Sequence, residues 1–256
     1  MSALHKIFPF FLAGGSCVAT FLAIYKLVLF LSMPQEVKVE KVWFYNFLDN
    51  ATLTHEIIST VVADLLLLTL FILPHSLMKT EAIKTFFHRR GLSTCHRTIY
   101  CLISSSTLMV LIKYWVTAPG LIIWRVDVAR DTRLWWLFVL IHAFAWIIIY
   151  GGSLIMDLLE ILGAKQIYHE ANNLAPPLLY KAIELRRLYG HVRHPSFICI
   201  TIILWVVNIL TLDRLVLNVL MTLYMYLAWN PNAQDLQYHR SQFSRKKYEL
   251  NLKIQI

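Results

Sequence analysis

Residues 188–212 read LYGHVRHPSFICITIILWVVNILTL, a polar, basic junction that directly precedes an apolar run. Proline favours the first position of a helix, because its missing N–H needs no partner there and its φ angle is already helical. Pro195 therefore predicts the start of a membrane helix, with Arg193 and His194 at its N-terminus. The positive end of the helix dipole, with an arginine beside it, favours binding of an anion. The alternative is an interfacial anchor, in which both side chains lie among lipid headgroups.

The composition of the whole chain indicates a membrane protein. Its 256 residues are 58% hydrophobic and 15% charged, whereas about a quarter of the residues in a soluble domain are charged. A transmembrane helix requires about 20 apolar residues, and the chain contains several such runs. The first, residues 7–31, is too long for the core of a signal peptide and lacks a clear cleavage site, so we expect it to be retained. The four scattered cysteines predict neither a disulfide framework nor a metal site.

The apolar runs predict an all-α fold, a polytopic bundle of about six spans that forms one integral membrane domain over residues 1–256. Residues 1–156 hold four spans, and Gly14-Gly15-Ser16 in the first offers small residues for close helix packing. In the connection over 157–195, the segment 178–189 suits either a helix on the membrane surface or a plain amphipathic connector. The predicted spans and tail are 7–32, 57–77, 98–116, 134–156, a tight helical hairpin within 195–229 (195–212 and 214–229) and a basic tail over 230–256.

The basic residues are concentrated on one side of the predicted bundle. Six spans place both termini on the same side, where 16 Lys and Arg residues fall against 6 on the other side. The positive-inside rule then assigns both termini, the Arg193-His194-Pro195 motif and the tail to the cytoplasmic or nucleoplasmic face. With a formal net charge of +9, we expect this protein to interact with anionic membrane lipids. No motif indicates sequence-specific binding of nucleic acid, and none indicates an oligomeric state.

Asp64 lies in the otherwise apolar run VVADLLLL of the second predicted span. An ionisable group there costs a few kcal/mol unless it is paired, so it marks a functional site or a structural ion pair. The predicted topology places Lys26, Lys113 and His142 in the same half of the membrane. We therefore expect Asp64 to form an intramembrane polar cluster with one or more of them, on the side opposite to Arg193. The alternatives are polar contacts that only hold the bundle together, or lysines that extend to the interface.

The C-terminal third resembles the isoprenylcysteine carboxyl methyltransferase superfamily and, within it, the nurim family of multi-pass inner nuclear membrane proteins. The superfamily resemblance covers about residues 185–250 and rests on YGHVRHPSF (189–197), the short hairpin and Gln234-Asp235. The nurim resemblance is broader: it adds the six spans, the basic tail and the segments LWVV (204–207), TLDRL (211–215) and QDLQY (234–238).

The superfamily resemblance implies a site for S-adenosylmethionine at the cytoplasmic face, beside an arginine that helps to orient a lipid carboxylate. It assigns no catalytic residue firmly, although Arg193, His194 and Asp235 are the catalytic candidates if the chain is active. The implied cofactor contacts are Tyr189, Arg193, His194, Pro195, Phe197 and Asp235.

The sequence departs from the superfamily pattern within this implied site. Arg187-Leu188 and Cys199 stand where the family has glycines, which permit close backbone approach to a ligand. Gln234-Asp235 replaces a run of glutamates. A cationic sulfonium cofactor needs carboxylate partners, and of these only Asp235 remains. We therefore expect a degraded cofactor site, although methyl transfer depends mostly on positioning and does not require a base.

Three functions follow from these features. The first, which we favour because the cofactor site is degraded, is a non-enzymatic multi-pass protein of the inner nuclear membrane on a methyltransferase-like scaffold. Its expected partners are membrane lipids and nuclear-envelope or lamina proteins, with no cofactor, and the endoplasmic reticulum membrane is the alternative location. The second function is an S-adenosylmethionine-dependent isoprenylcysteine-type carboxyl methyltransferase. The third is a lipid- or sterol-binding membrane protein that keeps the cavity without the chemistry.

Overall fold

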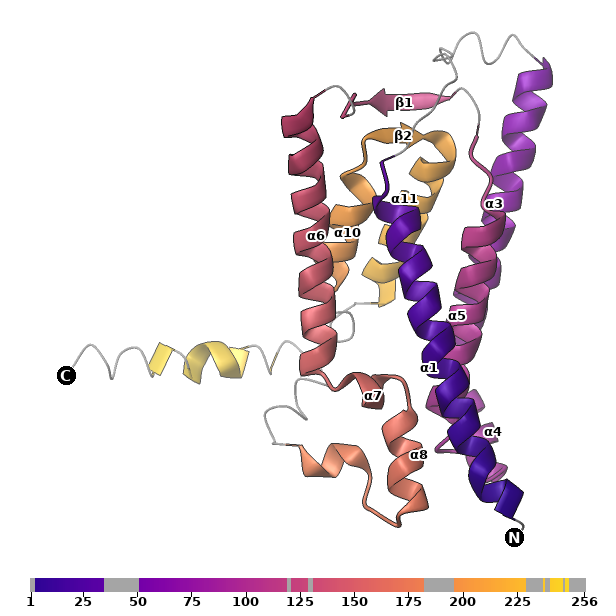
Figure 1. Cartoon of the computed structure of the whole chain (residues 1–256), viewed down its shortest axis with the longest axis vertical. Coiled ribbons are helices and arrows are strands. Elements are labelled where there is room, and N and C mark those ends of the chain that lie inside the picture. The colour runs from indigo at the N-terminus through magenta and orange to yellow at the C-terminus, as the bar shows by residue number, and fades with distance from the viewer. Residues whose placement is uncertain are drawn as a thin grey trace.

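The structure, a computed structural model, is a bundle of long helices with a small sheet at one end (Figure 1). It describes residues 3–34, 51–118, 121–128, 131–181 and 196–228, and in the tail 237, 240–245 and 247–248. The described elements are α1 (Ala3–Ser32), α3 (Ala51–Leu77), α4 (Glu81–Arg89), α5 (His96–Tyr114), β1 (Ile122–Arg125), α6 (Thr132–Ile155), α7 (Leu158–Ile161), α8 (Ala164–Ala171), a 3-10 turn η1 (Pro177–Tyr180), α10 (Phe197–Trp205), β2 (Ile209–Thr211) and α11 (Leu212–Ala228). This architecture confirms the predicted all-α membrane bundle.

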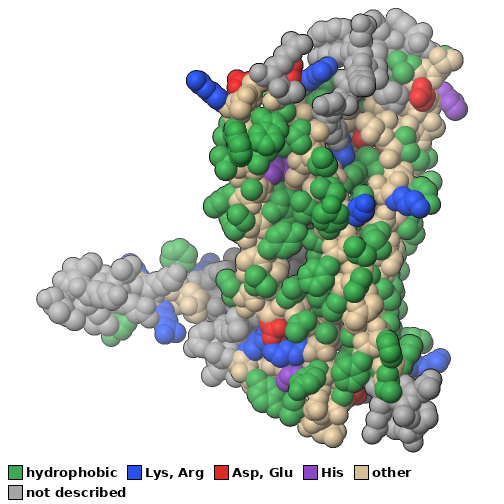
Figure 2. Space-filling view, in the orientation of Figure 1, with side chains coloured by type: hydrophobic (Ala, Val, Ile, Leu, Met, Phe, Trp, Pro, Cys, Tyr) green, Lys and Arg blue, Asp and Glu red, His purple; other side chains and the backbone are tan. Residues whose placement is uncertain are grey.

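Three of the described helices are long and apolar enough to cross a membrane: residues 7–32 of α1, α3 and α6. Large apolar side chains cover much of the outer surface of the bundle (Figure 2). Phe11, Leu66 and Ile155, one from each of these helices, are all more than half exposed. Such extensive apolar exposure marks a surface that contacts lipid rather than water.

The first helix of the hairpin, α10, is much shorter than the long helices around it. The sequence predicted a span over 195–212, but α10 ends at Trp205 and is nine residues long. At 1.5 Å per residue it covers about 13 Å, less than half of a hydrocarbon core of about 30 Å. The connection to α11 is extended over residues 206–211 rather than a direct turn.

Partners from outside the helix explain why α10 stops at Trp205. Strand β2 pairs antiparallel with β1, with Leu210 opposite Trp124. The Trp124 indole N–H donates to the Val207 carbonyl oxygen at 3.1 Å. The Asn218 side-chain amide donates to the Leu204 carbonyl oxygen at 2.5 Å, a group that the ended helix leaves without its usual N–H partner. The backbone is therefore satisfied without further helical turns.

The hairpin packs at the centre of the bundle. Leu204 of α10 and Leu217 of α11 share one apolar cluster with Leu68 of α3 and Leu111 of α5. A second cluster joins Ile203 to α6. These contacts bury the apolar hairpin among four longer helices, which accounts for its position despite its short length.

α1 and α5 pack closely through small residues. The Ser16 hydroxyl donates to the Thr98 carbonyl oxygen at 3.0 Å, and Ser16, Ala13 and Ala23 are all buried. Gly14 and Gly15, which were predicted to belong to this packing face, are exposed instead. The small-residue contact with the start of α5 therefore involves Ala13 and Ser16, which lie three residues apart on one face of α1.

The short elements after α6 form a compact unit against the start of α5. Glu160 of α7 and Lys181 form a buried ion pair at 2.6 Å. Gly163 has a φ angle of 87°, and a Cβ atom there would lie 2.7 Å from the Thr98 backbone nitrogen. Of the segment predicted to be an amphipathic helix or connector, residues 178–180 belong to η1, and 182–189 lie outside the described residues.

Candidate functional site

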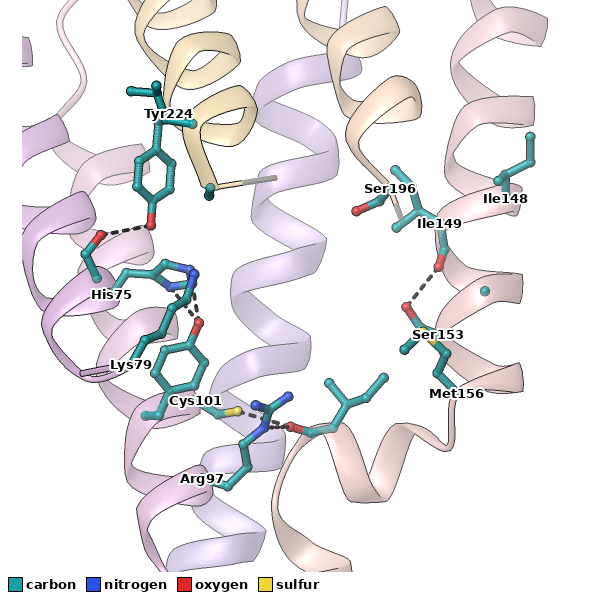
Figure 3. Close-up of a pocket in the computed structure, with 16 residues that line it drawn as sticks. His75, Lys79, Arg97, Cys101, Ile148, Ile149, Ser153, Met156, Ser196 and Tyr224 are labelled. Carbon is teal, nitrogen blue, oxygen red and sulfur yellow. Dashed lines mark hydrogen bonds between the residues drawn. The ribbon is translucent and has the colours of Figure 1, made fainter. Parts of the chain in front are cut away.

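A cavity of about 1100 Å³ lies between α3 and α5 on one side and α6 on the other (Figure 3). Ser196, immediately before α10, and Leu227 and Ala228, at the end of α11, also line it. Among the described residues, the cavity therefore lies next to the first residue before α10 and the last residues of α11.

One wall of the cavity carries a network of aromatic and polar side chains from three helices. The Tyr100 hydroxyl lies 3.0 Å from His75 Nε2, and His75 Nδ1 lies 3.2 Å from the Ser104 hydroxyl. The Ser76 hydroxyl lies 3.0 Å from the Tyr224 hydroxyl. The rings of His75 and Tyr100 are 5.1 Å apart between centroids. This network positions polar groups toward the cavity from α3, α5 and α11.

This network was not predicted from the sequence, although the sequence contains a usable signal for it. His75, Tyr100 and Tyr224 each lie near one end of a predicted span. The alternating topology places those three ends on the same side of the membrane. Polar residues grouped at equal depth in this way predict a shared site, because ionisable and hydrogen-bonding groups in spans seldom face lipid.

Two cations lie on the same wall, Lys79 just beyond α3 and Arg97 in the first turn of α5 (Figure 3). The Arg97 Nε donates to the Ile161 carbonyl oxygen at 2.8 Å. Partial desolvation by the surrounding atoms and the nearby Arg97 charge lower the pKa of the Lys79 ammonium. Among the described residues, no carboxylate forms an ion pair with either cation.

The opposite wall is largely apolar and comes from α6. Ile148, Ile149 and Met156 line the cavity there, and the Ser153 hydroxyl donates to the Ile149 carbonyl oxygen of its own helix at 2.8 Å. Gly152 also lines the cavity, and a Cβ atom placed on it would meet no atom within 4 Å. The cavity is therefore cationic and polar on one side and apolar on the other.

A second group of charges is buried at the opposite end of the bundle, near the sheet. Asp64 and Asp213 are fully buried, and Arg214 is 8% exposed. The Asp213 carboxylate accepts the Trp115 indole N–H and the Ala118 backbone N–H, both at 3.0 Å. The Arg214 guanidinium attracts both carboxylates and lies 3.9 Å from the centre of the Phe30 ring.

The structure divides the predicted intramembrane cluster. Asp64 is buried as expected, and its Oδ1 accepts the Val116 backbone N–H at 3.1 Å. Lys26 and Lys113 are exposed, and neither forms an ion pair with a carboxylate among the described residues. Arg214 lies near enough for its charge to attract the Asp64 carboxylate. The basic group near Asp64 is therefore Arg214, not Lys26 or Lys113 as the sequence predicted.

His142, the third predicted partner, forms different contacts. Its Nδ1 lies 2.7 Å from the Ser32 hydroxyl, and its Nε2 lies 2.6 Å from the Val206 carbonyl oxygen. The Trp146 indole N–H donates to the same Ser32 hydroxyl at 2.8 Å. His142 therefore joins α1 and α6 to the extended connection after α10, rather than to Asp64.

Known proteins similar to this chain cover most of its length. It is 44% identical over 231 residues to a nurim homolog of Drosophila pseudoobscura pseudoobscura. The matched region covers 90% of this chain and 91% of that protein. It is 37% identical over 198 residues to nurim of Mus musculus, and this match covers 76% of this chain and 75% of the mouse protein. The chain belongs to the nurim family. No family model matches this nurim-family chain, and no solved structure matches it.

Most of the cofactor contacts implied by the wider superfamily resemblance cannot be placed in this nurim-family protein. Phe197 opens α10 and packs against the central apolar cluster, and it is not among the described residues that line the cavity. Ser196 lines the cavity and directly follows the Arg193-His194-Pro195 motif in the sequence. The contacts outside the described residues are Tyr189, Arg193, His194, Pro195 and Asp235.

The charge of the described cavity wall disfavours a sulfonium cofactor. S-adenosylmethionine carries a positive sulfonium, which nearby carboxylates stabilise and nearby cations destabilise. The described lining contains Lys79 and Arg97 and no acidic residue. Like charges at close range repel, and the low dielectric of a membrane protein interior strengthens that repulsion. The charge of this wall is suited to an anion.

Proposed function

We propose that this nurim-family chain is a non-enzymatic multi-pass protein of the inner nuclear membrane, built on a methyltransferase-like scaffold. The single observation that carries the proposal is the charge of the described cavity wall, which has two cations and no carboxylate. A cationic cofactor is disfavoured there, and so is the chemistry that depends on it. The protein then acts through its surfaces and its bound lipids rather than through turnover.

The nuclear location and the orientation are part of this proposal. The family resemblance implies the inner nuclear membrane. The described elements at the cavity end are basic: α4 and its flanks carry Lys79, Lys84, Arg89 and Arg90 against Glu81. With this end toward the nucleoplasm, as the positive-inside rule predicts, these cations lie where acidic partners of the nuclear envelope or lamina can reach them.

Selective permeabilisation of cells that express the full chain with an N-terminal epitope tests this proposal. Digitonin opens the plasma membrane and leaves the nuclear envelope closed, whereas Triton opens both. We expect a rim stain around the nucleus that antibodies reach only after Triton treatment. A reticular stain that antibodies reach after digitonin alone would place the epitope on the cytoplasmic face of the endoplasmic reticulum and contradict the nuclear location.

A further inference from the structure

Lys79 and Arg97 form a cationic pair that no described carboxylate neutralises. Lys79 lies two residues beyond the end of α3, and Arg97 lies in the first turn of α5, so both belong at the membrane interface. Each charge is close enough to the other for Arg97 to disfavour protonation of Lys79. Two cations held together in a partly desolvated wall repel each other, and a bound anion removes that repulsion.

The apolar wall of the same cavity lies deeper in the bundle than this cationic pair. Ile148 and Ile149 are about two turns from the end of α6, on the side toward the membrane centre. The volume of about 1100 Å³ exceeds the roughly 300–1,000 Å³ typical of sites for small molecules. A ligand that matches this arrangement has an anionic group at the interface and a long apolar part inside the bundle.

We propose that the cavity binds one anionic phospholipid. Its phosphate lies between Lys79 and Arg97, and an acyl chain extends along Ile149 and Gly152 of α6 toward Leu227 of α11. Ser196 before α10 and Leu227 of α11 line the same cavity, so the hairpin borders the bound lipid. A free phosphate offers the same anionic chemistry without the chain, so the test has to separate the two.

The test uses the folded full chain in neutral detergent with a fluorescent phosphatidic acid as the probe. We expect unlabelled phosphatidic acid to displace the probe at least about tenfold more effectively than phosphatidylcholine. Inorganic phosphate and S-adenosylmethionine at the same concentrations should not displace it. Equal displacement by phosphatidylcholine would overturn the proposal, as would full displacement by phosphate alone or by S-adenosylmethionine.

A matched pair of charge variants locates the phosphate. Lys79→Gln removes a cavity cation, and we expect it to weaken probe binding at least about fivefold. Lys84→Gln removes a cation that pairs with Glu81 on the exposed face of α4 and does not line the cavity, so binding should be unchanged. Arg97 is avoided because its Nε also holds the Ile161 carbonyl. Equal effects of Lys79→Gln and Lys84→Gln would contradict the assignment.

A second matched pair locates the acyl chain. Gly151 and Gly152 are neighbours in α6, and a Cβ atom on either would meet no atom within 4 Å, so larger side chains can be placed there. Only Gly152 lines the cavity. We expect Gly152→Leu to reduce probe binding severalfold and Gly151→Leu to leave it intact, with both proteins unfolding at the temperature of the parent or above. Full binding by a folded Gly152→Leu protein would show that the chain lies elsewhere.

Discussion

At the scale of single residues, the charged side chains near the sheet are those whose burial costs the most free energy unless they have partners. Asp64, Asp213 and Arg214 lie inside the bundle, where an unpaired charge is costly. Each carboxylate accepts a backbone N–H from the segment after α5, from Val116 and Ala118. These charge-assisted hydrogen bonds connect that segment to α3 and α11 at the point where the sheet begins.

Removal of Asp213 should therefore be strongly destabilising. Asp213→Ala leaves the Arg214 guanidinium with one carboxylate fewer and the Trp115 and Ala118 donors unpaired. We expect a loss of about 3–5 kcal/mol in the free energy of unfolding. Lys113→Met changes an exposed lysine at a similar depth, and it should be nearly neutral. The midpoints of thermal unfolding in detergent measure both, and a larger loss in Lys113→Met would restore the lysine as the structural partner.

A second prediction at this scale concerns the close approach at Gly163. Gly91 and Gly163 both have positive φ angles, of 67° and 87°, but only Gly163 lies against another backbone, at Thr98. Gly91→Ala should cost about 1–2 kcal/mol for the left-handed conformation alone. Gly163→Ala should cost about 1–3 kcal/mol more, because the Thr98 backbone nitrogen cannot rotate away. Equal shifts of the unfolding midpoint would mean that the contact with α5 is unimportant.

The sequence predicted that Asp64 is buried and paired, but it could not identify the partner. Depth in the membrane follows from counting residues along a span, and by depth Lys26, Lys113 and His142 were all suitable. The direction in which each side chain points depends on how each helix is rotated about its axis relative to its neighbours. Counting residues along a span gives no information about that rotation. Arg214 was predicted as the first residue of the hairpin's second helix and was counted among the charges of the membrane face, so it was not considered as a partner.

At the scale of elements, the best predicted features are the long helices. The predicted bounds 134–156 lie close to those of α6, Thr132–Ile155, because lipid requires a continuous apolar run. Asp131 then caps the helix by accepting the Arg133 N–H at 2.8 Å. The early end of α10 could not be predicted, since it depends on β1, about 85 residues earlier in the chain.

The end of α10 gives a prediction for the hairpin. Asn218→Leu removes the donor to the Leu204 carbonyl, which then lacks a partner in an apolar environment. We expect a loss of about 1–3 kcal/mol in the free energy of unfolding. Thr201→Val serves as the control, because the Thr201 hydroxyl bonds only to the Phe197 carbonyl of its own helix. If Asn218→Leu were as stable as Thr201→Val, the side chain would not hold the helix end.

At the scale of the whole molecule, the cavity brings together residues of α3, α5, α6 and α11 that are far apart in the sequence. The apolar runs predicted the order of the long helices and the hairpin, but not the short elements α4, α7 and α8 or the two strands. The family resemblance pointed to the same end of the bundle as the cavity. The sequence could not show the cationic wall, because Lys79 and Arg97 come from two helices and meet only after folding. Phe197 is the implied cofactor contact that lies among the described residues, and it packs against the apolar core.

The proposed role without S-adenosylmethionine is tested most directly by calorimetric titration of that cofactor into the folded protein. The account predicts no saturable heat up to millimolar cofactor, on protein whose folding is verified by its thermal transition. Micromolar binding that is lost in both Asp235→Ala and Arg193→Ala would contradict it, and would indicate an active methyltransferase site.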